Sequence, residues 1–161
     1  MSRTSFVRNA IIVGALALAL NSSANAQTPT PTPAPLKFFA VTPCRIVDTR
    51  GPVGINGGPH LTRQWRAFAV TGLCGIPSDA AAVAFNMTIM NATLDGFLVA
   101  FPYNTPQPVS RVINWAAGEP AIANGAIVPV TQGSLNLQTI CAITQGGTAD
   151  LVIDVTGYFH Q

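Results

Sequence analysis

Residues 80–90, AAAVAFNMTIM, form the longest mainly apolar stretch beyond the N-terminal region of the chain. Its larger apolar side chains recur at every second position, and they are Val83, Phe85, Met87 and Ile89. The residues between them are small or uncharged. A period of two places alternate side chains on opposite faces of a β-strand. The stretch therefore predicts a strand with one face buried and the other largely covered, as in the middle of a β-sandwich.

Further short segments of the same character follow the N-terminal region, separated by turns rich in Gly and Pro. We expect these strands at residues 36–41, 44–48, 65–71, 97–101, 109–114, 124–130, 134–140 and 150–159. Asp95-Gly96 follows the central stretch and is typical of a hairpin turn. About nine short strands predict an all-β fold, an antiparallel β-sandwich or jelly-roll-like domain spanning residues 36–161.

The first 26 residues have the three parts of a signal peptide. Arg3 and Arg8 supply positive charge, residues 10–20 are apolar, and residues 24–26, ANA, form a small-x-small cleavage site. A retained N-terminal anchor is the alternative, but an apolar run of this length favours cleavage. We therefore expect a secreted or extracellular protein, at the cell surface or in the periplasm, without a membrane span after cleavage.

Residues 27–35, QTPTPTPAP, form a Thr/Pro-rich linker. Alternating prolines favour extended polyproline II, so the segment is either a stalk or a simple leader. Cleavage of the signal peptide would remove two of the eight basic residues and none of the six acidic ones. A nearly neutral domain lacks the basic stripe of a nucleic-acid-binding protein, and its low charge favours association.

Several short motifs lie in a recognisable order along the chain. They are PCRIVDTR at 43–50, CGIP at 74–77, NMT at 86–88, GFL at 96–98, SRVIN at 110–114, AN at 123–124 and DVTGYF at 154–159. Together they resemble a bacterial family of secreted or cell-surface β-rich domains, which occur alone, in tandem or appended to peptidoglycan amidases and proteases. The resemblance covers nearly all of residues 39–159 and implies an accessory domain. Met87 stands where Val is usual, and Cys141 has no counterpart in the pattern.

Three cysteines in an exported chain favour a disulfide bond. They allow three pairings, and spacing alone does not decide between them. We favour Cys44–Cys74, because both residues lie at the ends of expected elements beside Pro or Gly. Cys141 lies in an apolar run and is expected to be a buried free thiol. No CxxC or HxxxH spacing occurs, so we expect no metal site and no cofactor.

Asp48 and Arg50 are two residues apart and would share one face of an extended segment. They would either bind a ligand such as Ca²⁺ or serve the fold, with Asp48 capping a turn and Arg50 bracing the Gly-rich residues 51–60. We favour the structural interpretation. Asp154 lies within an expected strand, where a lone acid is either near the surface or paired with a partner such as Arg45. Asp48 and Asp154 are also the one carboxylate pair that we would test for glycosidase chemistry.

The catalytic inventory is poor, because Glu119 is the single Glu and no GxSxG, HExxH or P-loop motif occurs. We therefore expect no enzymatic activity. Trp115 and Tyr103 lie beside Asn, Pro and Gly and are candidates for stacking on sugars, with core packing as the alternative. The favoured function is a non-catalytic interaction module for a cell-surface or extracellular protein or glycan, or for a second copy of the chain. A carbohydrate-binding module comes second and a hydrolase third.

Overall fold

The computed structural model describes residues 34–143 and 146–161, without the side chains of residues 138–143. The expected signal peptide and most of the Thr/Pro linker lie outside this range. All regular elements within it are β-strands, as predicted. They are β1 (Lys37–Asp48), β2 (Trp65–Phe68), β3 (Ala82–Met90), β4 (Gly96–Pro102), β5 (Ile113–Trp115), β6 (Ala121–Pro129), β7 (Leu137–Ile143) and β8 (Asp150–His160).

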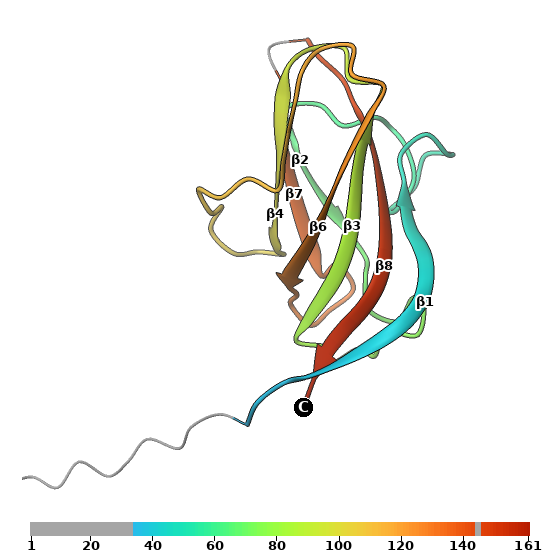
Figure 1. Ribbon diagram of the computed structural model, residues 1–161, viewed down its shortest axis with the longest axis vertical. Coiled ribbons are helices and arrows are strands. Elements are labelled where there is room, and N and C mark those ends of the chain that lie inside the picture. The colour runs from blue at the N-terminus through green and yellow to red at the C-terminus, as the bar shows by residue number, and fades with distance from the viewer. Residues whose placement is uncertain (1–33, 144–145) are drawn as a thin grey trace, which may run out of the picture. The chain divides into compact units, whose positions relative to one another are not determined.

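The strands form two antiparallel sheets of four strands each. The first has the order β1-β8-β3-β6 and the second the order β2-β7-β4-β5. Figure 1 shows β1, β8, β3 and β6 side by side in one layer, and β4, β7 and β2 in another. Large apolar side chains from both sheets form one hydrophobic core.

The stretch that predicts the central strand occupies an interior position of the first sheet, as β3. Its inward residues Val83, Phe85, Met87 and Ile89 are almost completely buried. Between and after them, Ala84, Asn86, Thr88 and Met90 are partly exposed, which confirms the predicted pattern. Burying each large side chain contributes roughly 1.5–3 kcal/mol relative to leaving it in water. This alternation therefore determines which face of the first sheet packs against the second.

The described residues form eight strands, whereas the sequence predicted about nine. The two expected strands at residues 36–41 and 44–48 are one continuous element, β1. The chain can continue through Pro43 because β1 lies at a sheet edge, and its register with β8 shifts between Ala40 and Cys44. Proline is tolerated at such edges and bulges because no hydrogen bond from its nitrogen is required there. A jelly-roll topology does not follow from the observed strand order.

The predicted hairpin at Asp95-Gly96 is wrong. β3 pairs with β6 and β8, whereas β4 pairs with β5 and β7, so residues 91–95 carry the chain from one sheet to the other. Asn91 directly follows β3 and has a φ of 53°, in the left-handed region that Asn tolerates. Ala92 is buried in the core, which directs the chain across the layers.

The structure contains the predicted Cys44–Cys74 disulfide. It joins β1 to the loop after β2, with 5.9 Å between the two Cα atoms. The bond links segments that lie 30 residues apart in sequence. The side chain of Cys141 lies outside the described residues, so its expected state as a free thiol stays a prediction.

Candidate functional site

The sequence-predicted polar residues lie in one network on β1 and β8. The Arg45 guanidinium donates to both carboxylate oxygens of Asp154, at 2.9 and 3.1 Å, which is the partner that the sequence suggested. The third guanidinium nitrogen of Arg45, Nη1, lies 3.6 Å from Asp48. Arg50 in turn donates to both oxygens of Asp48, at 2.8 and 2.6 Å. Arg45 therefore joins Asp48, Arg50 and Asp154 into one chain of ion pairs.

This network keeps the Asp48 carboxylate charged. Hydrogen bonds from the Arg50 guanidinium, followed by its backbone N–H and the charges of Arg50 and Arg45, lower the pKa of Asp48 to about 2. The hydrogen bond to Asp154 raises the pKa of Arg45. The Arg50 N–H donates to the Asp48 carboxylate at 3.2 Å, which closes a local turn after β1. A glycosidase needs one carboxylic acid that holds a proton, and an ionised Asp48 paired with Arg50 does not provide it.

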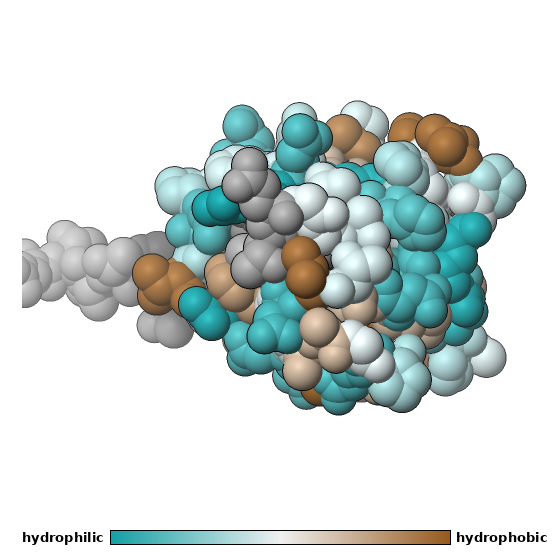
Figure 2. Space-filling model, turned by 90° about the horizontal axis from the view of Figure 1, so that it is seen from above, coloured by the Kyte–Doolittle hydropathy of each residue, from teal (hydrophilic) through white to brown (hydrophobic). Residues whose placement is uncertain are grey.

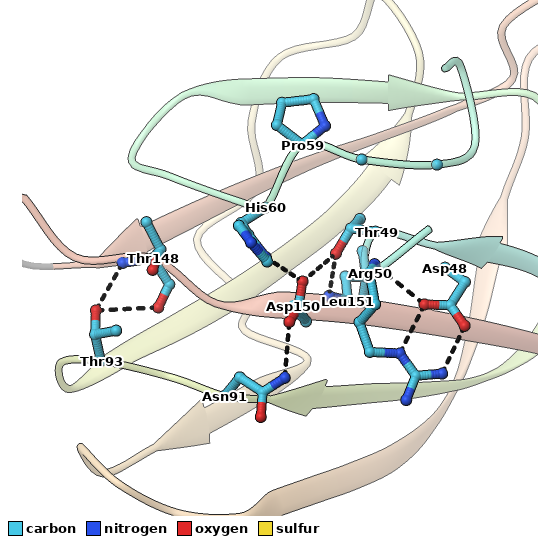
Figure 3. Close-up of polar contacts among 12 residues, drawn as sticks. Asp48, Thr49, Arg50, Pro59, His60, Asn91, Thr93, Thr148, Asp150 and Leu151 are labelled. Atoms are coloured by element: carbon cyan, nitrogen blue, oxygen red, sulfur yellow. Dashed lines mark hydrogen bonds and ion pairs between the residues drawn. The ribbon is translucent and has the colours of Figure 1, made fainter. Parts of the chain in front are cut away.

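A second polar cluster, which the sequence analysis missed, is centred on Asp150 at the start of β8 (Figure 3). The side chain of Asp150 is 1% exposed. One of its oxygens accepts from the Thr49 hydroxyl at 3.0 Å and contacts Nδ1 of His60, and the other accepts from the Asn91 amide at 2.8 Å. The Thr49 oxygen also accepts from the N–H of Leu151 at 2.9 Å. This buried carboxylate therefore holds β1, the end of β3 and residue 60 together.

His60 is the exposed member of this cluster and the last residue of the Gly-rich loop, which we define as residues 51–60. Aspartate bonded to one ring nitrogen of a histidine is an arrangement that orients catalytic or metal-binding histidines. A catalytic unit also needs a nucleophile or substrate pocket beside the imidazole. Thr49 and Asn91 are bonded to Asp150 instead, as Figure 3 shows. The cluster thus anchors the end of the Gly-rich loop.

Arg66 holds the middle of the Gly-rich loop, a role that the sequence analysis assigned to Arg50. The guanidinium of Arg66 donates to carbonyl oxygens of Gly54, Gly57, Gly58 and Pro59. The Arg50 guanidinium donates to Asp48 instead, which corrects that expectation. Arginine suits the task because its planar fork carries five N–H donors.

Asn56 fixes the tip of the same loop. Its amide nitrogen donates to the carbonyl of Ala69 at 2.8 Å, and its amide oxygen accepts from the N–H of Ala69 at 3.0 Å. Val53 and Ile55, which precede Asn56 in the loop, are 82% and 64% exposed. Contacts with Arg66, Ala69 and Asp150 therefore hold the loop in place, while the side chains of Val53 and Ile55 project into solvent.

The two aromatic candidates have different environments. Trp115 is 6% exposed, packs in the core as part of β5, and donates its indole N–H to the carbonyl of Leu94 at 3.0 Å. A ring in this position has no face available to a sugar, so Trp115 does not fulfil the predicted stacking role. Tyr103 is partly exposed in the loop after β4. Trp65 on β2 is also exposed and meets Phe101 edge-on, with 5.9 Å between ring centroids.

The hollows on the described surface include two of about 400 and 450 Å³. One, of about 450 Å³, lies beside Asp79 and His160, which form an ion pair at 3.0 Å. This hydrogen bond raises the pKa of His160 and lowers that of Asp79. The other hollow, of about 400 Å³, is lined by Ala84, Gly125, Ile127 and neighbouring residues of the first sheet. Neither hollow is lined by Asp48, Asp150 or Asp154.

Within the described ranges, no group of three or more His, Cys, Asp or Glu residues lies close enough together to hold a metal ion. Those same residues contain no helix long and apolar enough to cross a membrane. No protein-family model and no curated protein matches this sequence. The resemblance in the motifs therefore remains a prediction, and any function must be argued from the structure itself.

Proposed function

We propose that this chain is a secreted β-sandwich domain that acts as a non-catalytic interaction module at a cell surface or in the extracellular medium. The observation that carries the proposal is the Gly-rich loop, whose Val53 and Ile55 are exposed although Arg66, Asn56 and His60 anchor the loop. Anchoring a loop before binding lowers the entropy lost on association. Exposed aliphatic side chains on an anchored loop suit contact with an apolar surface of a partner protein.

The acidic residues support a role without turnover. Asp48 and Asp154 are both paired with arginines, and the buried Asp150 accepts from three side chains. A general acid or base must exchange protons with a substrate that lies within hydrogen-bond distance. These carboxylates are instead used to connect strands and to anchor a loop.

Export supports the same proposal. The N-terminal residues have the pattern of a signal peptide, and the Cys44–Cys74 disulfide fits an oxidising compartment outside the cytoplasm. Figure 2 shows a surface that is mostly hydrophilic or neutral, with hydrophobic residues in small separate groups. Small apolar groups on a nearly neutral surface suit weak contacts that gain strength when several copies act together.

The proposal is tested by sedimenting the processed chain with cell-envelope material from the producing cells. We expect the wild type to co-sediment and to release no product from peptidoglycan, polysaccharide or ester substrates. Replacing Val53 and Ile55 together by Ser should weaken retention at least about tenfold, since burying one such side chain is worth about 1.5–3 kcal/mol. Val109→Ser is the matched control, because Val109 is fully exposed in another loop. Product release, or equal retention of all three proteins, would contradict the proposal.

Carbohydrate binding is the second candidate, and the exposure of Tyr103 and Trp65 is the observation in its favour. Aromatic faces in solvent suit stacking on sugar rings. A glycan array should then give signals that Tyr103→Ala or Trp65→Ala abolishes while the Val53 and Ile55 replacements leave them unchanged. Signals that none of these variants changes would exclude both surfaces as the glycan site.

A further inference from the structure

The two sheets have four edge strands, and three of them carry features that prevent pairing with another chain. β2 and β5 are four and three residues long. β1 is longer, but it contains Pro43, the charged Lys37 and Arg45, and two shifts in its register with β8. Short strands, proline, charge and bulges are the means by which natural sheets protect their edges.

The fourth edge strand, β6, has almost none of these features. Its nine residues pair with β3 in unbroken register, from Ala82 opposite Pro129 to Met90 opposite Ala121. None of the nine residues, AIANGAIVP, is charged, and its single proline is the last residue. β6 is therefore a long, regular and uncharged sheet edge.

The pairing with β3 shows which backbone groups of β6 face away from the sheet. Ala81 and Val130 lie next to the last pair of the β3–β6 ladder, Ala82 with Pro129. Val130 donates to the carbonyl of Ala81 at 3.1 Å, so these two residues form a hydrogen-bonded pair. Such pairs alternate along an antiparallel ladder, so the even-numbered residues of β6 bond to β3 and the odd-numbered ones point outward. Pro129 agrees with this assignment, because it has no N–H to give to β3. The outward N–H groups are those of Ala121, Ala123, Gly125 and Ile127.

The described part of the chain offers these outward groups no partner. The backbone hydrogen bonds formed outside the strand pairs include none from Ala123, Gly125 or Ile127. Asn124 is one of the even-numbered residues, whose backbone groups bond to β3. Its side chain donates to the carbonyl of Val112 at 2.8 Å. That bond ties β6 to the second sheet without occupying its outward groups.

We propose that β6 pairs with β6 of a second copy of this chain, antiparallel and about a two-fold axis. The inference rests on the proposed function as an interaction module and names one partner. With Gly125 opposite its own counterpart, the two strands form about eight hydrogen bonds, and Ile127 of each copy lies opposite Ala123 of the other. Ile127 is 62% exposed, and small residues opposite it leave room for its side chain. Two uncharged edges meet without like-charge repulsion.

A second copy is a better partner for β6 than a strand of another protein, because its own β6 is an equally unprotected edge. Most proteins protect their edge strands, so a foreign partner would have to supply an unusual one. The symmetric pair also joins the two first sheets into one continuous sheet of eight strands, which leaves neither β6 edge open.

Sedimentation of the processed chain over a range of concentrations tests this proposal. We expect a monomer–dimer equilibrium whose dissociation constant rises at least about tenfold in Ile127→Lys, since lysine on an edge strand opposes pairing. Val109→Lys is the matched control, because it places the same charge at a fully exposed aliphatic position outside β6. A wild type that stays monomeric, or equal weakening by both variants, would overturn the proposal.

Amide hydrogen exchange identifies the surface that pairs. In dilute protein the amides of Ala123, Gly125 and Ile127 should exchange quickly, and those of Ile122 and Ala126 slowly. At high concentration the exchange of the Ala123, Gly125 and Ile127 amides should become at least about tenfold slower.

Dimers in which these amides still exchange quickly would place the interface elsewhere and overturn the proposal. Slow exchange in a monomer would mean that another segment of the same chain covers β6, which also overturns it. Envelope binding by a monomer would retain the proposed function and reject this inference.

Discussion

Gly157 in β8 is the position where the smallest change should have the clearest effect on stability. A Cβ atom built there would lie 2.3 and 2.5 Å from ring carbons of Phe38 and 2.7 Å from the backbone oxygen of Phe39. Real Cβ atoms do not approach other atoms so closely. The Phe38 ring, which is half exposed, can move, but the Phe39 carbonyl belongs to the paired part of β1. Gly157→Ala must therefore displace β1 as well as a side chain.

The expected magnitude follows from two opposing terms. Overpacking of this kind destabilises a fold by about 1–3 kcal/mol. Replacing glycine by alanine without strain stabilises by about 0.4–1 kcal/mol, because the unfolded chain loses freedom. Gly125 in β6 is a matched control, since its nearest atom to a new Cβ is the Phe85 oxygen at 3.9 Å, an ordinary contact. We expect Gly157→Ala to be less stable than wild type and Gly125→Ala to be equal to it or slightly more stable.

Urea denaturation of the disulfide-intact protein measures both free energies of unfolding. The double variant Phe38→Ala with Gly157→Ala separates the two causes of the clash. Removing the ring should restore part of the lost stability, and the remainder reports the contact with the Phe39 carbonyl. The reasoning is refuted if Gly157→Ala is as stable as Gly125→Ala.

Two further predictions concern the polar network and the disulfide. The folded-state pKa of Asp48 lies below its value in the unfolded chain, so its stabilising effect is present above about pH 4 and is lost as the pH falls towards about 2. Asp48→Asn should lower the melting temperature at pH 7 and leave it nearly unchanged at pH 2; an equal decrease at both pH values would show that the charge is irrelevant. Replacing Cys44 and Cys74 together by Ser should cost roughly 3.5 kcal/mol, the chain-entropy value for a loop of about thirty residues. Denaturation with and without a reductant measures this, and a wild type that reduction does not destabilise would contradict it.

Local patterns predicted the strands well and their partners poorly. The alternation in residues 80–90 identifies β3 because burial on one face directly selects the residues of that strand. The Asp95-Gly96 dipeptide indicates a turn but carries no information on which strand the chain meets next. β4 pairs with β7, about forty residues further along, because its inward residues complete the core opposite β3. Contacts of such separation are set by packing of the whole domain, and no short window of sequence contains them.

For the polar residues too, the sequence predicted some contacts and missed others. A lone acid in a strand needs a partner, so Arg45 could be proposed for Asp154 from the burial penalty alone. The partners of Asp150 come from three separate segments, and no local sequence pattern around Asp150 predicts them. Trp115 was misplaced because its Asn and Gly neighbours resemble a loop, although its ring faces the core from β5. An arginine close to a glycine-rich segment was the one available signal for Arg66.

The distribution of bonds favours two surfaces for the proposed interactions of this molecule. Arg45, Asp48, Arg50 and Asp154 are paired with one another, and Asp150 and Arg66 are used to anchor the Gly-rich loop. Binding through those side chains would require breaking charge-assisted bonds, which are roughly twice as strong as neutral ones. Binding at Val53 and Ile55, or at the outward backbone groups of β6, breaks no charge-assisted bond. It displaces only water from these groups. Both features are uncharged, so binding at either surface should depend little on salt.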